Sequence, residues 1–241
     1  MTQIWSYQPA LHLDRTFVGR MADFPREPDM LAYGLRMLSA AAIRAYLGLY
    51  HRLSITGRHN LDVPGSFVLV ANHASHLDTL CLLAALPLGR LHQAFPAAAT
   101  DYFFVSHSRL AIAVLAVNAL PFDRSRHVRH SIQRCRQLLS EPGNILILYP
   151  EGTRTTTGAM GAFKPGIGKL VAGLDVPVIP CFLQGAFKAL PKGNWLPRPR
   201  KLHLTIGAPR CYRGRDSSCE SARWISQDLQ YALAALKGNR S

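Results

Sequence analysis

The sequence predicts an α/β fold: a mixed, largely parallel β-sheet flanked by helices, with an N-terminal helical segment at a membrane interface. Short, uninterrupted apolar runs such as 66–71 and 145–149 suit strands that are covered on both faces. Segments with helical spacing separate these runs, which is typical of α/β sheets. The 241 residues suffice for one such domain with a small helical appendage.

The N-terminal region divides into an arm and a helix. Residues 1–28 hold prolines and mixed charges without periodicity, so we expect an irregular arm. The next stretch, 30–53, is apolar and helix-forming, and three arginines interrupt it: Arg36, Arg44 and Arg52. A bilayer-spanning helix needs about 20 residues with few charges, so we expect no span here. The helix can lie in the interface with its guanidinium groups at the headgroups, or it can pack on the domain core.

Turn residues divide the rest of the chain into alternating elements. Residues 57–65 suit a loop or a short strand, and proline or glycine ends several of the following segments. The expected strands are 66–71, part of 94–105, 119–122, 145–149, 176–182 and 202–206. The expected helices are 79–86, 110–117, 128–139, 166–172 and 219–236.

The formal net charge of +14 predicts an anionic partner, such as phosphate groups, an anionic bilayer or nucleic acid. We expect no nucleic acid, because the basic residues are spread along the chain and no zinc-finger, RNP or helix-turn-helix signature occurs. The five cysteines are odd in number and lack C-x-x-C spacing, so we expect free thiols in a reducing, cytosolic compartment. The N-terminus also lacks the pattern of a secretory signal.

A first group of polar residues, Asn72-His73-Ala74-Ser75-His76-Leu77-Asp78, follows the strand at 66–71. Ligands bind outside the carboxyl ends of strands in open α/β sheets, so this loop is well placed for function. If Ser75 caps the next helix, Asp78 falls in its first turn and His73 can fold back to meet the carboxylate. Such a carboxylate keeps one imidazole nitrogen protonated and leaves the other free as a general base for a hydroxyl.

Two other interpretations of this group stay open. Ser75-x-x-Asp78 is also a capping-box-like pattern, in which Asp78 only stabilises the start of a helix. His73, His76 and Asp78 could also supply three metal ligands. We expect no metal, because no H-E-x-x-H and no second His/Cys cluster has matching spacing.

A second group, Tyr149-Pro150-Glu151-Gly152-Thr153-Arg154-Thr155, follows the strand at 145–149. Arg154 offers a rigid fork of donors for a phosphate. Gly152 permits a close backbone approach, and Glu151 could hold Arg154 or a neighbouring backbone amide in place. The alternative is a polar turn with a surface ion pair.

Two further segments could complete an anion-binding site. Lys164 precedes two glycines at a helix start, where it could add a phosphate contact. This segment lacks the P-loop pattern, which excludes an ATPase of that type. Residues 118–124 end in a charged turn, where Arg124 could join an anion cradle or belong to a solvated basic face.

Together these segments resemble the glycerolipid acyltransferases of the 1-acylglycerol-3-phosphate acyltransferase type. Residues 72–78 match the family's N-H-x-S-x-x-D form of the H-x4-D motif, and 151–154 match its E-G-T-R block. Residues 118–124 fall where the family has an arginine-ending block, and 176–180 match its apolar, proline-ending segment. The resemblance covers about residues 55–210, with the four motifs in the family's order.

The resemblance implies a role for each matching residue. His73 would deprotonate the acceptor hydroxyl, and Asp78 would orient the imidazole. The acceptor phosphate would be bound by Glu151, Gly152, Thr153 and Arg154, assisted by Arg124 and Lys164. The donor would be an acyl-CoA or an acyl-carrier-protein thioester, with no metal and no bound cofactor.

The implied reaction moves a fatty acyl group to the free hydroxyl of a lysophospholipid, with 1-acylglycerol-3-phosphate as the default acceptor and phosphatidic acid as product. An acyltransferase domain would span 55–241, behind an arm and interface helix in 1–54. The protein would be peripheral or monotopic on the cytoplasmic face of an anionic membrane. Asn118 and Pro121 depart from the family's usual glycine and aromatic, which leaves another acceptor open, such as a lyso amino-acid lipid. A hydrolase and a non-catalytic lipid-surface protein are the rivals.

Overall fold

The computed structural model describes residues 30–99, 117–124 and 127–238. In chain order, its elements are α2 (Met30–Leu49), β1 (Ser54–Thr56), the 3-10 helix η1 (Arg58–Leu61), β2 (Phe67–Ala71), α3 (Leu77–Ala85), the 3-10 helix η2 (Leu88–Gln93), β3 (Ala94–Ala99), β4 (Leu120–Phe122), α6 (Val128–Ser140), β5 (Ile145–Leu148), α7 (Gly166–Val171), β6 (Val178–Gln184), α8 (Ala186–Ala189), β7 (His203–Ile206) and α9 (Cys219–Leu236).

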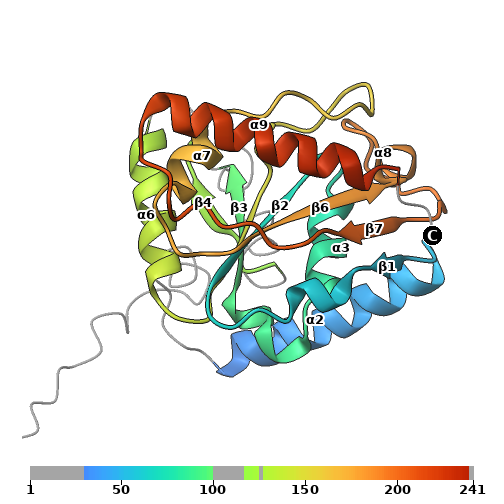
Figure 1. Ribbon diagram of the computed structural model, residues 1–241. Helices are drawn as coiled ribbons and strands as arrows, with labels where there is room; N and C mark the ends of the chain where they lie inside the picture. Colours follow the sequence, from blue (N-terminus) through green and yellow to red (C-terminus); the bar gives the residue numbers. More distant parts are fainter. Residues whose placement is uncertain (1–29, 100–116, 125–126, 239–241) are drawn as a thin grey trace, which may run out of the picture.

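The described strands form one seven-stranded sheet in the order β1-β7-β6-β2-β5-β3-β4 (Figure 1). β2 lies in the middle and pairs in parallel with both β5 and β6. β3 pairs in parallel with β5 and β4, and β1 pairs in parallel with β7. β6 and β7 pair antiparallel. The structure therefore confirms the predicted mixed, largely parallel sheet.

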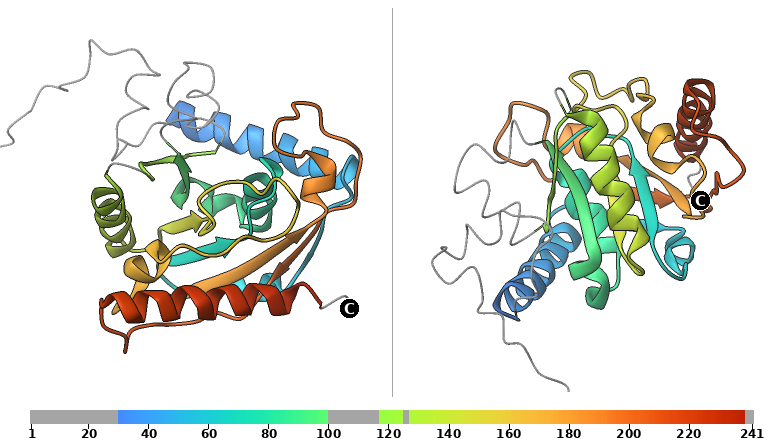
Figure 2. Two further views of the ribbon diagram at one scale, coloured as in Figure 1. Left: turned by 90° about the horizontal axis from the view of Figure 1, so that it is seen from above. Right: turned by 90° about the vertical axis from the view of Figure 1, so that its left-hand side faces the viewer.

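Alternating side chains of β2 divide the core into two layers. Phe67 and Leu69 face a cluster that also contains residues of α2, α3 and η2. Val68 and Val70 face a cluster built with residues of α6, α7 and α9. Consistent with this division, α2 and α9 lie on opposite faces of the sheet (Figure 2). Because both faces are covered, the central strands are apolar throughout, which is why the sequence predicts them.

Helix α2 packs on the domain through its arginine side. Arg36 is buried and donates from Nη2 to Oδ1 of Asn118 at 3.2 Å, and Arg44 donates to the carbonyl of Leu86. These contacts match the alternative in which the helix packs on the core, and a position at a membrane interface stays a prediction. Large apolar side chains of this helix are exposed at Met30, Leu35, Met37, Leu38 and Leu49. Within the described ranges, no helix is both long and apolar enough to cross a bilayer.

Several boundaries differ from those that the sequence predicts. Helix α2 ends at Leu49 rather than 53, because Arg52 takes a left-handed φ of 48° and the chain turns into β1. The sequence does not predict β1, since three residues are too few to show the period of a strand. Helix α3 begins two residues before the expected 79. The helix expected at 110–117 lies outside the described residues, apart from its last position.

Candidate active site

The two loops that carry most of the predicted site residues meet at one edge of the sheet. They follow β2 and β5, which are parallel neighbours with Val70 opposite Leu148. The helix after β2 covers one face of the sheet and the helix after β5 covers the other. Ligands bind at such a reversal in open α/β sheets. The N–H of Thr155 donates to the carbonyl of His73 at 2.9 Å, which ties the loops together.

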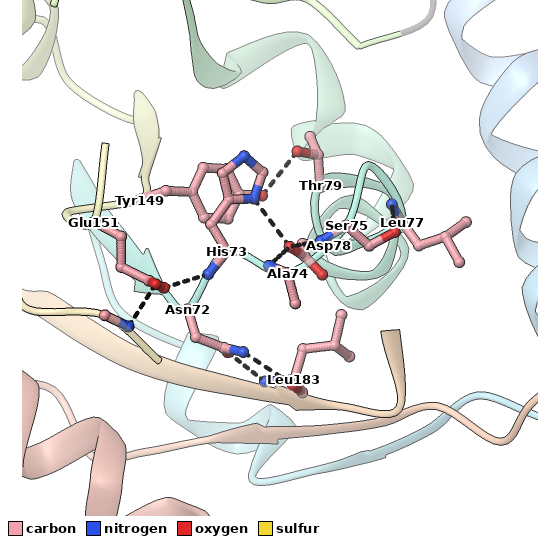
Figure 3. Close-up of polar contacts among 11 residues, drawn as sticks. Asn72, His73, Ala74, Ser75, Leu77, Asp78, Thr79, Tyr149, Glu151 and Leu183 are labelled. Atoms are coloured by element: carbon pink, nitrogen blue, oxygen red, sulfur yellow. Dashed lines mark hydrogen bonds and ion pairs between the residues drawn. The ribbon is translucent and has the colours of Figure 1, made fainter. Parts of the chain in front are cut away.

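Asn72 fixes the start of the first loop on strand β6. Its Nδ2 donates to the carbonyl of Leu183 at 3.1 Å, and its Oδ1 accepts the N–H of Leu183 at 2.8 Å (Figure 3). The side-chain amide thus continues the ladder beyond the last paired residue of β2, Ala71. This anchor sets the point from which His73 leaves the sheet.

His73 and Asp78 form the contact that the sequence predicts, with 2.9 Å between Nδ1 and Oδ2 (Figure 3). An ionised carboxylate only accepts hydrogen bonds, so this contact stabilises the tautomer with the proton on Nδ1 and leaves the Nε2 lone pair free. The Asp78 side chain is 1% exposed, whereas the His73 side chain is 19% exposed. The imidazole is therefore accessible while its carboxylate is shielded from water.

Asp78 also stabilises the start of α3, so one carboxylate makes both the capping contacts and the contact with His73, and its role in orienting a base stays a prediction. Its Oδ2 accepts the N–H groups of Ala74 at 2.7 Å and Ser75 at 2.8 Å. Ser75 Oγ accepts the N–H of Leu77 at 3.2 Å, which explains why the helix begins at Leu77. A carboxylate fixed by two backbone donors and one imidazole cannot swing away from His73.

Tyr149 supports the imidazole from the neighbouring strand. Its ring stacks on that of His73, with 4.0 Å between centroids and 15° between planes. The Tyr149 hydroxyl lies 2.8 Å from Oγ1 of Thr79 on α3 (Figure 3). Burial raises the pKa of the Tyr149 phenol well above its usual value, so it remains neutral. Sequence reasoning gives no role to Tyr149, because the stacking depends on which strands are neighbours.

Glu151 binds backbone amides on both of its carboxylate oxygens. Oε1 accepts the N–H of His73 at 2.6 Å, and Oε2 accepts the N–H of Gly161 at 2.7 Å. Burial raises the pKa of Glu151, while these two hydrogen bonds act in the opposite direction. The geometry matches the alternative in which Glu151 holds a neighbouring amide, and it connects the loop at 151–161 to the backbone of His73.

Three cations lie against the loop at 151–154, two of them from segments that are distant in sequence. Arg124 donates from Nη1 to the carbonyl of Gly152 at 2.8 Å. Lys164 packs against Gly152, so closely that a β-carbon at position 152 would lie 2.8 Å from its Nζ. Lys192 donates from Nζ to Oγ1 of Thr153 at 3.3 Å, a neighbour that no sequence motif indicates. With half-buried Arg154 on the loop itself, this region is strongly basic.

Gly152 fits its position for two reasons. Its φ of 74° lies in the left-handed region, where residues with a β-carbon are strained. A side chain there would also displace the Lys164 ammonium group. The glycine therefore keeps both the turn and the adjacent cation in place. A direct phosphate contact of this loop stays a prediction.

The described residues do not form a metal site. No group of three or more His, Cys, Asp or Glu side chains in the described ranges could hold a metal ion. The Nδ1 of His73 is engaged by Asp78, and this carboxylate is already shared with two amides. The arrangement of these groups suits a base and its orienting acid.

Comparison with known proteins identifies acyltransferases as relatives of this chain. The profile of the acyltransferase family matches residues 52–184. The chain is 32% identical over 148 residues to the chloroplastic 1-acyl-sn-glycerol-3-phosphate acyltransferase LPAT1 of Arabidopsis thaliana, covering 60% of this chain and 39% of that protein. It is 30% identical over 181 residues to a 1-acyl-sn-glycerol-3-phosphate acyltransferase of Chlamydomonas reinhardtii, covering 72% and 52%. The chain thus spans about half, or less, of these relatives.

A solved structure extends the likeness over the fold. The crystal structure of the 1-acyl-sn-glycerophosphate (LPA) acyltransferase PlsC from Thermotoga maritima aligns with a TM-score of 0.64 and 25% sequence identity. The alignment covers 93% of this chain and 89% of that one. Because the family profile covers more than half of the chain and includes both loops of the site, the protein belongs to the acyltransferase family.

Proposed function

We infer that the protein transfers a fatty acyl group from a thioester to the free hydroxyl of 1-acylglycerol-3-phosphate, giving phosphatidic acid. The relatives named above support this acceptor, since both are 1-acyl-sn-glycerol-3-phosphate acyltransferases. The observation that carries the proposal is the partly exposed His73 imidazole, held at 2.9 Å by buried Asp78. A basic loop lies on the adjacent strand end, where a phosphate would be bound.

The reaction proceeds in one displacement. His73 Nε2 accepts the proton of the acceptor hydroxyl as its oxygen attacks the thioester carbonyl. The carbon–sulfur bond breaks, and the thiolate leaves with the proton carried by His73, so that an ester and a free thiol are the products. Asp78 stabilises the transient imidazolium and does not itself move. The step needs neither a metal nor a bound cofactor.

The basic loop positions the acceptor for that attack. Arg154 and Lys164 are suited to the phosphate, and Arg124 and Lys192 hold the loop through Gly152 and Thr153. A phosphate held there fixes the glycerol backbone within reach of His73, because Glu151 joins both loops. Fixing two reactants in this way lowers the entropic cost of the reaction. The donor is acyl-CoA or an acyl-carrier protein.

An assay of the purified protein with a panel of lysolipids and both donor types tests this proposal. We expect phosphatidic acid from 1-acylglycerol-3-phosphate, and we expect His73→Ala to lower kcat by about two to four orders of magnitude. His127→Ala is a matched control, because His127 makes a similar Nδ1 contact of 3.0 Å to Asp123 in an exposed position. Free fatty acid as the product would point to a hydrolase, and lipid binding without transfer would point to a non-catalytic protein.

A further inference from the structure

The segment between α8 and β7 presents an unusually exposed apolar pair. The side chain of Trp195 is 87% exposed and that of Leu196 is 64% exposed. Within the described residues, Trp195 is the most exposed large apolar side chain. Exposed apolar groups of this size are unfavourable in water and commonly mark an interaction site.

The backbone holds this pair in a fixed protrusion. The N–H of Arg198 donates to the carbonyl of Ala189 at 2.7 Å, which closes the loop at its base. The hydroxyl of Tyr50, just after α2, donates to the carbonyl of Pro197 at 3.0 Å. The loop is thereby joined to the end of α2, as Figure 2 also shows. The apolar pair is presented by a supported structure.

The end of α2, which this hydrogen bond joins to the loop, also carries exposed apolar side chains. Leu49 is 84% exposed, and Tyr50 contacts the loop through Pro197. We call the four side chains Leu49, Tyr50, Trp195 and Leu196 the tryptophan patch. They come from two segments that are distant in sequence, the end of α2 and the loop between α8 and β7, which the contact of Tyr50 with Pro197 holds together.

Along the loop, basic residues lie on both sides of the apolar pair in sequence, and no acidic residue occurs. No Asp or Glu occurs between Gly185 and Leu202, and the basic residues in that interval are Lys188, Lys192, Arg198, Arg200 and Lys201. All five are exposed. Exposed aromatic and aliphatic side chains on a loop that otherwise carries cations suit the interface of an anionic bilayer, where tryptophan lies at headgroup depth. A second copy of a chain with a net charge of +14 would meet the same positive charge.

The patch also adjoins the basic loop of the active site. Lys192, three residues before Trp195, donates to Thr153 at 3.3 Å. We propose that the tryptophan patch inserts into the surface of an anionic bilayer and holds the active-site rim against the headgroups. The acceptor lipid then reaches the basic loop without crossing bulk water. This last consequence rests on the proposed function, whereas the insertion itself does not.

Quenching by brominated phospholipids tests the insertion directly. The chain has three tryptophans, so Trp5→Phe combined with Trp224→Phe leaves Trp195 as the single emitter. With vesicles of phosphatidylcholine and phosphatidylglycerol, we expect a blue shift and quenching by lipids brominated near the headgroup. An unquenched, unshifted Trp195 in vesicle-bound protein would overturn the proposal.

Vesicle sedimentation gives the energetic test. Trp195→Ser with Leu196→Ser should weaken binding to the anionic vesicles by about tenfold or more, the scale expected for two buried apolar side chains. Tyr231→Ser is the matched control, because Tyr231 is 76% exposed on α9, on the opposite face of the sheet from α2. Equal binding by the double variant and this control would contradict the proposal.

The charge around the patch has its own variant. Arg198→Gln with Arg200→Gln should weaken binding to the anionic vesicles by about tenfold and leave binding to pure phosphatidylcholine unchanged. These assays contain no thioester, so they measure membrane binding independently of acyl transfer. A protein that binds vesicles but does not transfer acyl groups would contradict the proposed function and leave the proposed insertion standing. If the protein forms concentration-dependent dimers that Trp195→Ser abolishes, the patch binds a second copy of the chain, and the proposal of bilayer insertion is overturned.

Discussion

At the scale of single residues, the carboxylate of Asp78 has two tasks on one oxygen. Its Oδ2 accepts hydrogen bonds from Nδ1 of His73 and from the backbone N–H groups of Ala74 and Ser75. The same contacts explain why a short pattern in the sequence supports both a capping and a catalytic interpretation. Capping places the carboxylate in the first turn of α3, and that position is the one from which it reaches the imidazole.

Replacing Asp78 with Asn separates these tasks. The asparagine oxygen, in the place of Oδ2, can still accept the two backbone amides and the Nδ1–H of His73, but it lacks the negative charge that stabilises the imidazolium formed in the reaction. We expect kcat to fall by about two to four orders of magnitude. We expect the free energy of unfolding to fall by only about 1–3 kcal/mol. Steady-state kinetics and urea unfolding measure both, and a fully active Asp78→Asn protein would contradict a catalytic role for the carboxylate charge.

Glu151 predicts a pH dependence of stability. Burial raises its pKa above the ordinary 4.5, so the folded protein binds this proton more tightly than the unfolded chain. The carboxyl group therefore stabilises the folded state most below about pH 4.5. This contribution is lost as the pH rises through the raised pKa of the folded protein. Glu151→Gln does not titrate. The unfolding free energy of the wild type relative to Glu151→Gln should decline over that window, and a difference that increases with pH would contradict the prediction.

The sequence predicts the pairing of residues that are close in the chain better than the pairing of residues that are far apart. His73 and Asp78 are five positions apart, and the short turn that Asp78 caps at the start of α3 brings them together. The stacking of Tyr149 on His73 and the contact of Lys192 with Thr153 require the strand order, which no local pattern contains. For the same reason, sequence reasoning cannot decide between an amide and a phosphate as the partner of Glu151.

At the scale of elements, strands with continuous apolar runs are predicted well, and short edge elements are not. β2 and β5 are buried on both faces, so every residue is selected for burial. β1 has three residues at the edge of the sheet, and α8 has four, which is too short for a helical period. The end of α2 depends on the left-handed φ of Arg52. The sequence does not predict this conformation, because it is uncommon for residues other than glycine.

The contact between α7 and α9 depends on a glycine. A β-carbon at Gly168 would lie 2.0 Å from the carbonyl oxygen of Ala222, which is backbone and cannot rotate away. Gly168→Ala should therefore force the helices apart and lower the free energy of unfolding by about 1–3 kcal/mol. Gly166→Ala is the control on the same helix, since nothing lies within 4 Å of its β-carbon. We expect no loss of stability there, and equal denaturation midpoints for the two variants would contradict this packing.

At the scale of the whole molecule, the sheet topology assembles the basic region of the site from segments that are distant in sequence. Arg124 follows β4 and Lys192 follows α8, yet both contact the loop after β5, against which Lys164 from the end of the same connection also packs. The net charge of +14 indicates an anionic partner but not where the charge is concentrated. That concentration arises because parallel strands direct their following loops to one edge.

Replacing Lys192 tests this assembly, because Lys192 belongs to no sequence motif of the site and reaches Thr153 only through the fold. Its ammonium group supports Thr153 and adds positive charge beside the position proposed for the acceptor phosphate. We expect Lys192→Gln to raise the KM for 1-acylglycerol-3-phosphate about fivefold, the effect of a partly exposed contact of about 1 kcal/mol, with kcat unchanged. Lys188→Gln on α8 is the control, since it removes an equally exposed charge from the same segment. Monoacylglycerol has no phosphate, so its slow acylation should be the same in both variants. An equal change in KM for both acceptors would mean that Lys192 supports the loop without contributing to phosphate binding.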